Sequence, residues 1–81
     1  MALRDDLIRA IELAAAGDWA AAHAIVQGHE GERDADWVHA VLHKIEGDAG
    51  NSRYWYGQAG KFYEAYADPE AELAAINAHV V

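Results

Sequence analysis

Residues 34–60 read DADWVHAVLHKIEGDAGNSRYWYGQAG, and this stretch decides the fold because it holds two helical segments joined by a Gly-Asp turn. Gly47 can end the first segment in a left-handed conformation, and Asp48 can cap the second segment at once. Two helices joined by so short a turn pack side by side in opposite directions. The stretch therefore predicts an antiparallel helical hairpin.

The same arrangement occurs upstream, where GDWAAAHAIVQ starts at Gly17, 30 residues before Gly47. It follows LRDDLIRAIELAAAG, which has apolar residues at helical spacing and acidic residues in its first turn. Each unit is thus a helix, a Gly-Asp turn and a second helix. Two hairpins of the same design are expected.

The remaining segments also predict helices. Asp68 and Pro69 open the last helical segment, DPEAELAAINAH, as a cap and a first-turn proline. We expect Asp34 to cap the helix of residues 35–46 in the same way, and residues 61–66 to form a short helix or a helical turn. No segment is typical of a strand. The predicted fold is all-α, a single helical domain over residues 1–81 with two antiparallel hairpins and a C-terminal closing helix.

Composition limits the classes of function. The chain has 81 residues and no cysteine, so any metal site must use His, Asp or Glu. Its formal net charge of -8 repels phosphate, and we expect neither nucleic acid nor a membrane surface as a partner. No stretch is apolar for long enough to span a bilayer, and the N-terminal residues lack the pattern of a signal peptide. A cytoplasmic protein is therefore expected.

The Gly-Asp turns resemble those of the tetratricopeptide repeat. The matching residues are Ala10, Gly17, Asp18 and Ala22 in the first unit and Ala40, Gly47, Asp48, Ser52, Tyr56 and Ala59 in the second. The period is shorter than the usual 34 or so residues, and the proline after the second helix is missing. The resemblance implies helical hairpins of the repeat type and places His39 and His43 against the partner helix.

Residues 37–56 are also similar to a family of small uncharacterised bacterial proteins, with related fungal sequences. Its signature reads approximately W-x-H-A-x-L-H-[RK]-x-E-G-D-x-x-N-[AS]-x-Y-W-Y. The matching residues are Trp37, His39, Ala40, Leu42, His43, Lys44, Glu46, Gly47, Asp48, Asn51, Ser52, Tyr54, Trp55 and Tyr56. This resemblance supports an all-helical fold and implies no activity.

Helical periodicity gives a different position for the two histidines. At 100° per residue, Asp36, His39, His43 and Glu46 share one polar face, opposite an apolar face that would be buried. An exposed polar face is a candidate ligand wall, whereas the repeat pattern buries the same imidazoles among hydrogen-bond partners. The candidate ligand-binding residues are His39, His43, Glu46, Asn51, Arg53 and Tyr54.

A metal site is the alternative for this region. His39 and His43 are four residues apart, a spacing at which two imidazoles can share a divalent ion, and Glu46 or Asp36 could add an oxygen ligand. The residues between the histidines do not form the HExxH pattern of metalloproteases. His23 and His29 are expected to be solvated surface residues. His79 is expected to lie at the end of the last helix, where a protonated imidazole interacts favourably with the helix dipole.

No catalytic motif is present, and Ser52 is the one aliphatic hydroxyl in the sequence. We therefore favour a noncatalytic binding or protein-interaction module of the helical-repeat type, without a cofactor. It would bind a protein partner or a small ligand of unknown identity in a groove near His39, His43, Arg53 and Tyr54, or self-associate through the exposed edge of the two repeats. The alternative is a small ligand- or metal-binding protein using His39, His43 and Glu46, with weak enzymatic activity left open.

Overall fold

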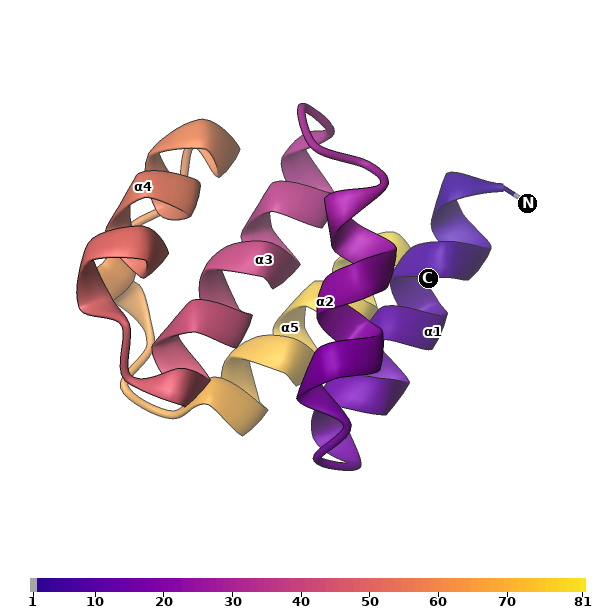
Figure 1. Cartoon of the computed structure of the whole chain (residues 1–81), viewed down its shortest axis with the longest axis horizontal. Coiled ribbons are helices and arrows are strands. Elements are labelled where there is room, and N and C mark those ends of the chain that lie inside the picture. Colours follow the sequence, from indigo (N-terminus) through magenta and orange to yellow (C-terminus); the bar gives the residue numbers. More distant parts are fainter. Residues whose placement is uncertain (1) are drawn as a thin grey trace.

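The computed structural model describes residues 2–81, which form five α-helices and contain no strand (Figure 1). The helices are α1 (Leu3–Ala15), α2 (Trp19–Gln27), α3 (Arg33–Glu46), α4 (Ala49–Ala59) and α5 (Pro69–Val80). The predicted all-α class is confirmed, and residues 63–65 form a single 3-10 turn within the segment expected to be a short helix or turn. None of the helices in these residues is long and apolar enough to cross a bilayer.

The two Gly-Asp turns have the predicted chemistry. Gly17 and Gly47 adopt positive φ angles of 87° and 84°, the left-handed region that glycine enters without a steric cost. Asp18 and Asp48 each accept a hydrogen bond from the backbone N–H three residues later, which caps α2 and α4. Helix α1 contacts α2 across the first turn, and α3 contacts α4 across the second.

The start of α3 differs from the prediction. The helix begins at Arg33, and its cap residue is Glu32, whose side chain makes no capping hydrogen bond. Asp34 lies inside the first turn of α3, where a negative charge interacts favourably with the helix dipole. Its Oδ1 atom lies 3.3 Å from Nε2 of His79. The expectation that Asp34 caps this helix is therefore wrong, because the backbone N–H of Asp36 already bonds to the carbonyl of Glu32.

Helix α3 lies at the centre of the molecule, between α2 and α4 in Figure 1, and it contacts all four other helices. Every residue from Ala35 to His43 is buried. The periodicity argument for an exposed polar face is therefore wrong over this length, because α3 has no solvent-facing side there. Asp36, His39 and His43 are enclosed with the apolar residues.

Helices α3 and α4 approach closely where both carry a small residue. The Ser52 hydroxyl donates a 2.7 Å hydrogen bond to the backbone carbonyl of Ala40, and neither side chain is exposed. A larger side chain at either position would separate the two backbones, since packed cores leave no spare volume. The small residues noted in the sequence therefore set the distance between these helices.

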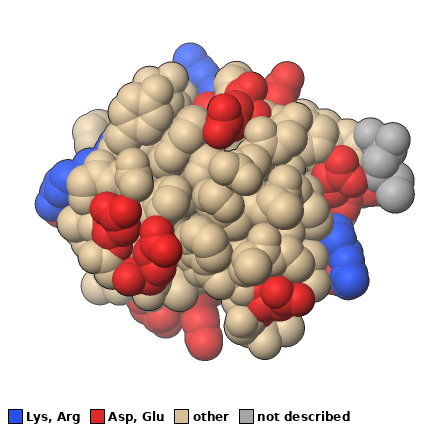
Figure 2. All heavy atoms as spheres, in the orientation of Figure 1, with Lys and Arg blue, Asp and Glu red and all other residues tan. Residues whose placement is uncertain are grey.

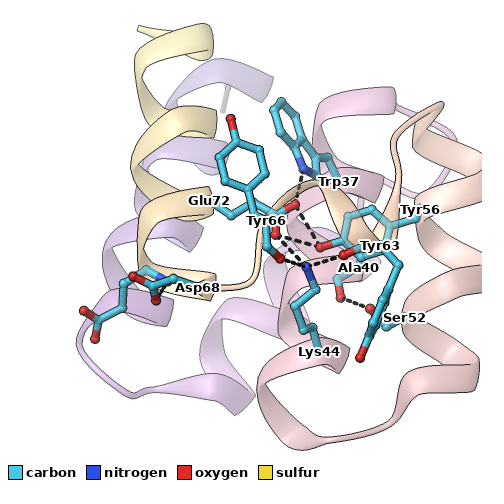
Figure 3. Close-up of polar contacts among 10 residues, drawn as sticks. Trp37, Ala40, Lys44, Ser52, Tyr56, Tyr63, Tyr66, Asp68 and Glu72 are labelled. Atoms are coloured by element: carbon cyan, nitrogen blue, oxygen red, sulfur yellow. Dashed lines mark hydrogen bonds and ion pairs between the residues drawn. The ribbon is translucent and has the colours of Figure 1, made fainter.

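A buried carboxylate joins α3, α4 and α5 (Figure 3). Glu72 on α5 is 1% exposed and accepts hydrogen bonds from Trp37 Nε1 and the Tyr56 hydroxyl, both at 2.8 Å. Lys44 Nζ lies 2.9 Å from the same carboxylate and donates to two backbone carbonyls of the α4–α5 connection. Burial and the neighbouring Glu72 carboxylate raise the pKa of the Tyr56 hydroxyl, which therefore stays protonated and remains a hydrogen-bond donor.

Breaking this buried ion pair should destabilise the fold strongly. Replacing Lys44→Met leaves the Glu72 charge buried without its counter-ion, and we expect the free energy of unfolding to fall by about 3 to 5 kcal/mol. Urea unfolding followed by circular dichroism measures the loss. Arg53→Met is the matched control, because the ion pair between Arg53 and Glu64 is exposed and should contribute little. Equal losses in the two variants would contradict a special role for the buried pair.

Candidate functional site

Three histidines from two helices meet between α2 and α3. His23 comes from α2, whereas His39 and His43 are one turn apart on α3. The Nε2 atoms of His39 and His23 are 3.1 Å apart, and the rings of His39 and His43 stack with centroids 5.0 Å apart. One ring nitrogen from each of the three residues lies within 4.8 Å of the others. We call His23, His39 and His43 the histidine cluster.

Two tryptophans form walls of the histidine cluster. The ring of Trp19 stacks on His23 at a centroid distance of 4.6 Å, and the ring of Trp55 stacks on His39 at 4.0 Å. Trp19 is itself fixed, because its Nε1 donates a 2.6 Å hydrogen bond to the carbonyl of Leu42. The indoles restrict the access of water to the imidazoles.

This environment favours neutral imidazoles. Burial, with the neighbouring His23 and His43, lowers the pKa of His39 to about 4. Burial also lowers the pKa of His23, and the neighbouring His43 adds to this shift. His23 and His39 are therefore neutral at pH 7, and a neutral imidazole has the free lone pair that metal binding requires.

Glu46 orients the third member of the cluster. Its Oε1 atom lies 2.5 Å from Nδ1 of His43, which assigns the proton of this imidazole to Nδ1. The lone pair of His43 is then on Nε2. A carboxylate that holds the outer nitrogen of a histidine in this way is the usual support of a metal-ligating imidazole. Glu46 therefore fits the role of an orienting residue better than that of a ligand.

One nitrogen of the cluster has no partner. His39 is 2% exposed, and its Nδ1 is the one buried side-chain polar atom without a hydrogen bond among residues 2–81. Leaving a buried polar atom unpaired costs about 1 to 3 kcal/mol, and such atoms are uncommon unless a site needs them. The imidazole of His39 is thus held by stacking and by His23 alone.

The other predicted ligand-binding residues lie elsewhere on α4. The Asn51 side chain donates to the carboxylate of Asp48, and Arg53 pairs with Glu64 at 2.6 Å. Tyr54 is 57% exposed. None of these residues hydrogen-bonds to the histidine cluster in the part of the chain that the structure describes. The structure therefore brings together His39, His43 and Glu46 but not the whole predicted set.

The structure also corrects the expectation for two histidines. His23 and His29 were expected to be solvated, but both are half-buried. His23 belongs to the cluster, and His29 Nε2 lies 2.8 Å from the carboxylate of Asp6 on α1. The sequence does contain one signal for His23. It follows Trp19 by four residues, which puts both rings on one face of α2.

These features define an all-helical protein in which three histidines converge and two of them each stack on an indole. Comparisons of the chain with protein-family models, with curated proteins and with solved structures found no match. The similarity to the tetratricopeptide repeat and to the small bacterial family therefore stays a prediction.

The lowered pKa of His39 makes stability depend on pH. Below pH 6.5 the unfolded chain protonates this imidazole, whereas the folded protein resists protonation until about pH 4. The stabilisation is therefore complete above pH 6.5, and about 3 kcal/mol is lost as pH falls to 4. Urea unfolding between pH 7.5 and 4 should show this loss. His39→Phe, which keeps a ring against Trp55, should flatten the curve, and parallel curves would refute the assignment.

Proposed function

We propose that this protein is a noncatalytic metal-binding protein that holds a zinc-type divalent ion on the histidine cluster. One observation carries the proposal: His23 and His39 point their Nε2 atoms at each other across 3.1 Å, with a nitrogen of His43 within 4.8 Å. Between two neutral imidazoles this contact is an N–H···N hydrogen bond, and the tautomers that carry both protons on Nδ1 free both Nε2 lone pairs for one shared ion.

The spacing fits tetrahedral coordination after a small movement. Zinc binds imidazole nitrogen at 2.0 to 2.1 Å, so two nitrogens on one tetrahedral ion are about 3.3 Å apart. The nitrogens of His23 and His39 already have nearly this separation. The nitrogen of His43 needs to move by at most about 1.5 Å to join them.

The donor set selects the class of metal. Three imidazoles suit Zn²⁺, Cu²⁺, Ni²⁺ or Co²⁺, whereas Mg²⁺ and Ca²⁺ prefer oxygen. Glu46 supports His43 from outside, in place of the oxygen ligand predicted from the sequence. Three protein ligands leave a fourth position for water or another small ligand. The net charge of -8 also favours the approach of a cation.

We favour this function over the protein-interaction module that the repeat pattern predicts. The groove proposed for a partner requires His39, His43, Arg53 and Tyr54 on one accessible surface, but the two histidines are buried. The paired helices α1 with α2 and α3 with α4, followed by α5, are then a scaffold of helical hairpins for the metal site. A protein partner or self-association remains a separate prediction.

Zinc titration tests the metal site. Isothermal titration of protein purified without a histidine tag should show one ion per chain, and native mass spectrometry should show the added mass. His23→Ala should abolish this binding, because two imidazoles alone hold the ion weakly. His29→Ala is the matched control, since it removes a half-buried histidine from the loop after α2, outside the histidine cluster. Equal zinc binding by wild type and His23→Ala would reject the site.

The orienting role of Glu46 has its own test. Glu46→Gln should keep the fold, because this side chain is exposed, but should weaken zinc binding by about 10- to 100-fold through the loss of support for His43. A competition titration with a zinc-binding dye measures the ratio. The exposed Glu12 on α1 provides the control variant Glu12→Gln, with the same charge change away from the cluster.

A further inference from the structure

A second pocket, on another side of α3, has the composition of a site for an organic cation. It has a volume of about 330 Å³ and lies between α3, the α4–α5 connection and α5. We call it the aromatic pocket, and its main lining residues are Trp37, Lys61, Phe62, Ala65, Tyr66 and Glu72. Figure 3 shows the rings of Tyr66 and Trp37 beside each other on one side of the Glu72 carboxylate. None of these residues belongs to the histidine cluster.

The aromatic pocket already holds an ammonium group. Lys61 Nζ lies 4.4 Å from the centre of the Trp37 ring, which is a cation–π contact with the aromatic side chain best suited to it. No hydrogen bond or ion pair of the Lys61 side chain is present in residues 2–81. The contact with the indole is therefore the only specific one that holds this flexible, exposed side chain in place.

The exposed ring of Phe62 is a second argument for a ligand. Phe62 is 76% exposed, the most exposed of the large apolar side chains in residues 2–81, and it lies at the same pocket. Tyr66 beside it is 36% exposed. Aromatic rings left at the rim of a cavity cost hydration free energy unless something covers them. Together with Trp37, they offer three rings to one occupant.

The faces of the aromatic rings at the pocket favour a cation. The Glu72 carboxylate forms part of its wall, and a second ammonium, that of Lys44, lies 4.8 and 4.9 Å from the rings of Tyr56 and Tyr63 close by. The whole chain carries a net charge of -8, and acidic side chains are spread over the face shown in Figure 2. The Glu72 carboxylate is already neutralised by Lys44, so the negative faces of the rings are what attracts an ammonium and disfavours an anion.

We propose that the aromatic pocket binds an alkylammonium ligand, whose cationic head replaces the Lys61 ammonium on the Trp37 indole. Lys61 then acts as an internal competitor that lowers the affinity of the wild-type protein. Because a cation–π contact changes an equilibrium constant by about 2- to 30-fold, removal of Lys61 should strengthen binding within this range. The proposal does not depend on the metal site.

Choline and its uncharged isostere 3,3-dimethyl-1-butanol are the probes for this pocket. Titrations followed by NMR at the Trp37 indole N–H should show saturable shifts with choline and none with the alcohol. Lys61→Ala should bind choline about 2- to 30-fold more tightly, whereas Phe62→Ala should bind it more weakly. Arg9→Ala is the control for the lost charge, because this exposed side chain lies on α1, away from the pocket.

Three results would overturn the proposal. Equal shifts with choline and the alcohol would mean that the pocket recognises shape and not charge. An unchanged affinity in Lys61→Ala would mean that choline does not occupy the indole face. No saturable shift in Lys61→Ala would mean that the pocket takes no alkylammonium group.

Discussion

The enclosure of α3 by the four other helices is the constraint on which the rest of this structure depends. A helix buried all round cannot turn its polar side chains to water, so each must find a partner inside the protein. Asp36 accepts from the backbone N–H of Gly31, and Trp37 and Lys44 reach the carboxylate of Glu72. The rings of His39 and His43 contact other aromatic and ionisable side chains, those of Trp19, His23, Glu46 and Trp55.

The Glu72 network and the histidine cluster accommodate the buried polar groups of α3 in different ways. The carboxylate of Glu72 is saturated by an ammonium, an indole N–H and a phenol hydroxyl, so its charge is fully compensated. In the histidine cluster, His23 and His39 instead stay neutral at pH 7, and Nδ1 of His39 is unpaired. A saturated carboxylate has no lone pair left for a metal ion, whereas the neutral imidazoles of His23 and His39 keep theirs. This contrast is why we place the metal in one cluster and assign a structural role to the other.

The local parts of the fold could be predicted because their causes lie within a few residues. Gly47 and Asp48 specify a turn by themselves, and the small residues Ala40 and Ser52 indicate a close helix contact. The cap of α3 could not be read in the same way, since neither Glu32 nor Asp34 makes the side-chain hydrogen bond that marks a helix start.

The histidine cluster could be predicted only in part, because it depends on contacts between distant residues. His39 and His43 stood out by their spacing, but periodicity assumes a single buried face and so assigned them to solvent. His23 is 16 residues from His39, and nothing short of the packing of α2 on α3 could bring the two together. Glu72 was missed for the same reason, since its partners come from α3 and α4.

The position of Glu72 on α5 also determines how this helix can separate from the rest of the fold. Its carboxylate is the shared acceptor of groups on α3 and α4, and Lys44 fastens the connecting segment to the same point. Detaching α5 would therefore expose an indole, a phenol and an ammonium at once. The first turn of α5 therefore cannot separate from the fold without breaking the hydrogen bonds that hold α3, α4 and the connecting segment together.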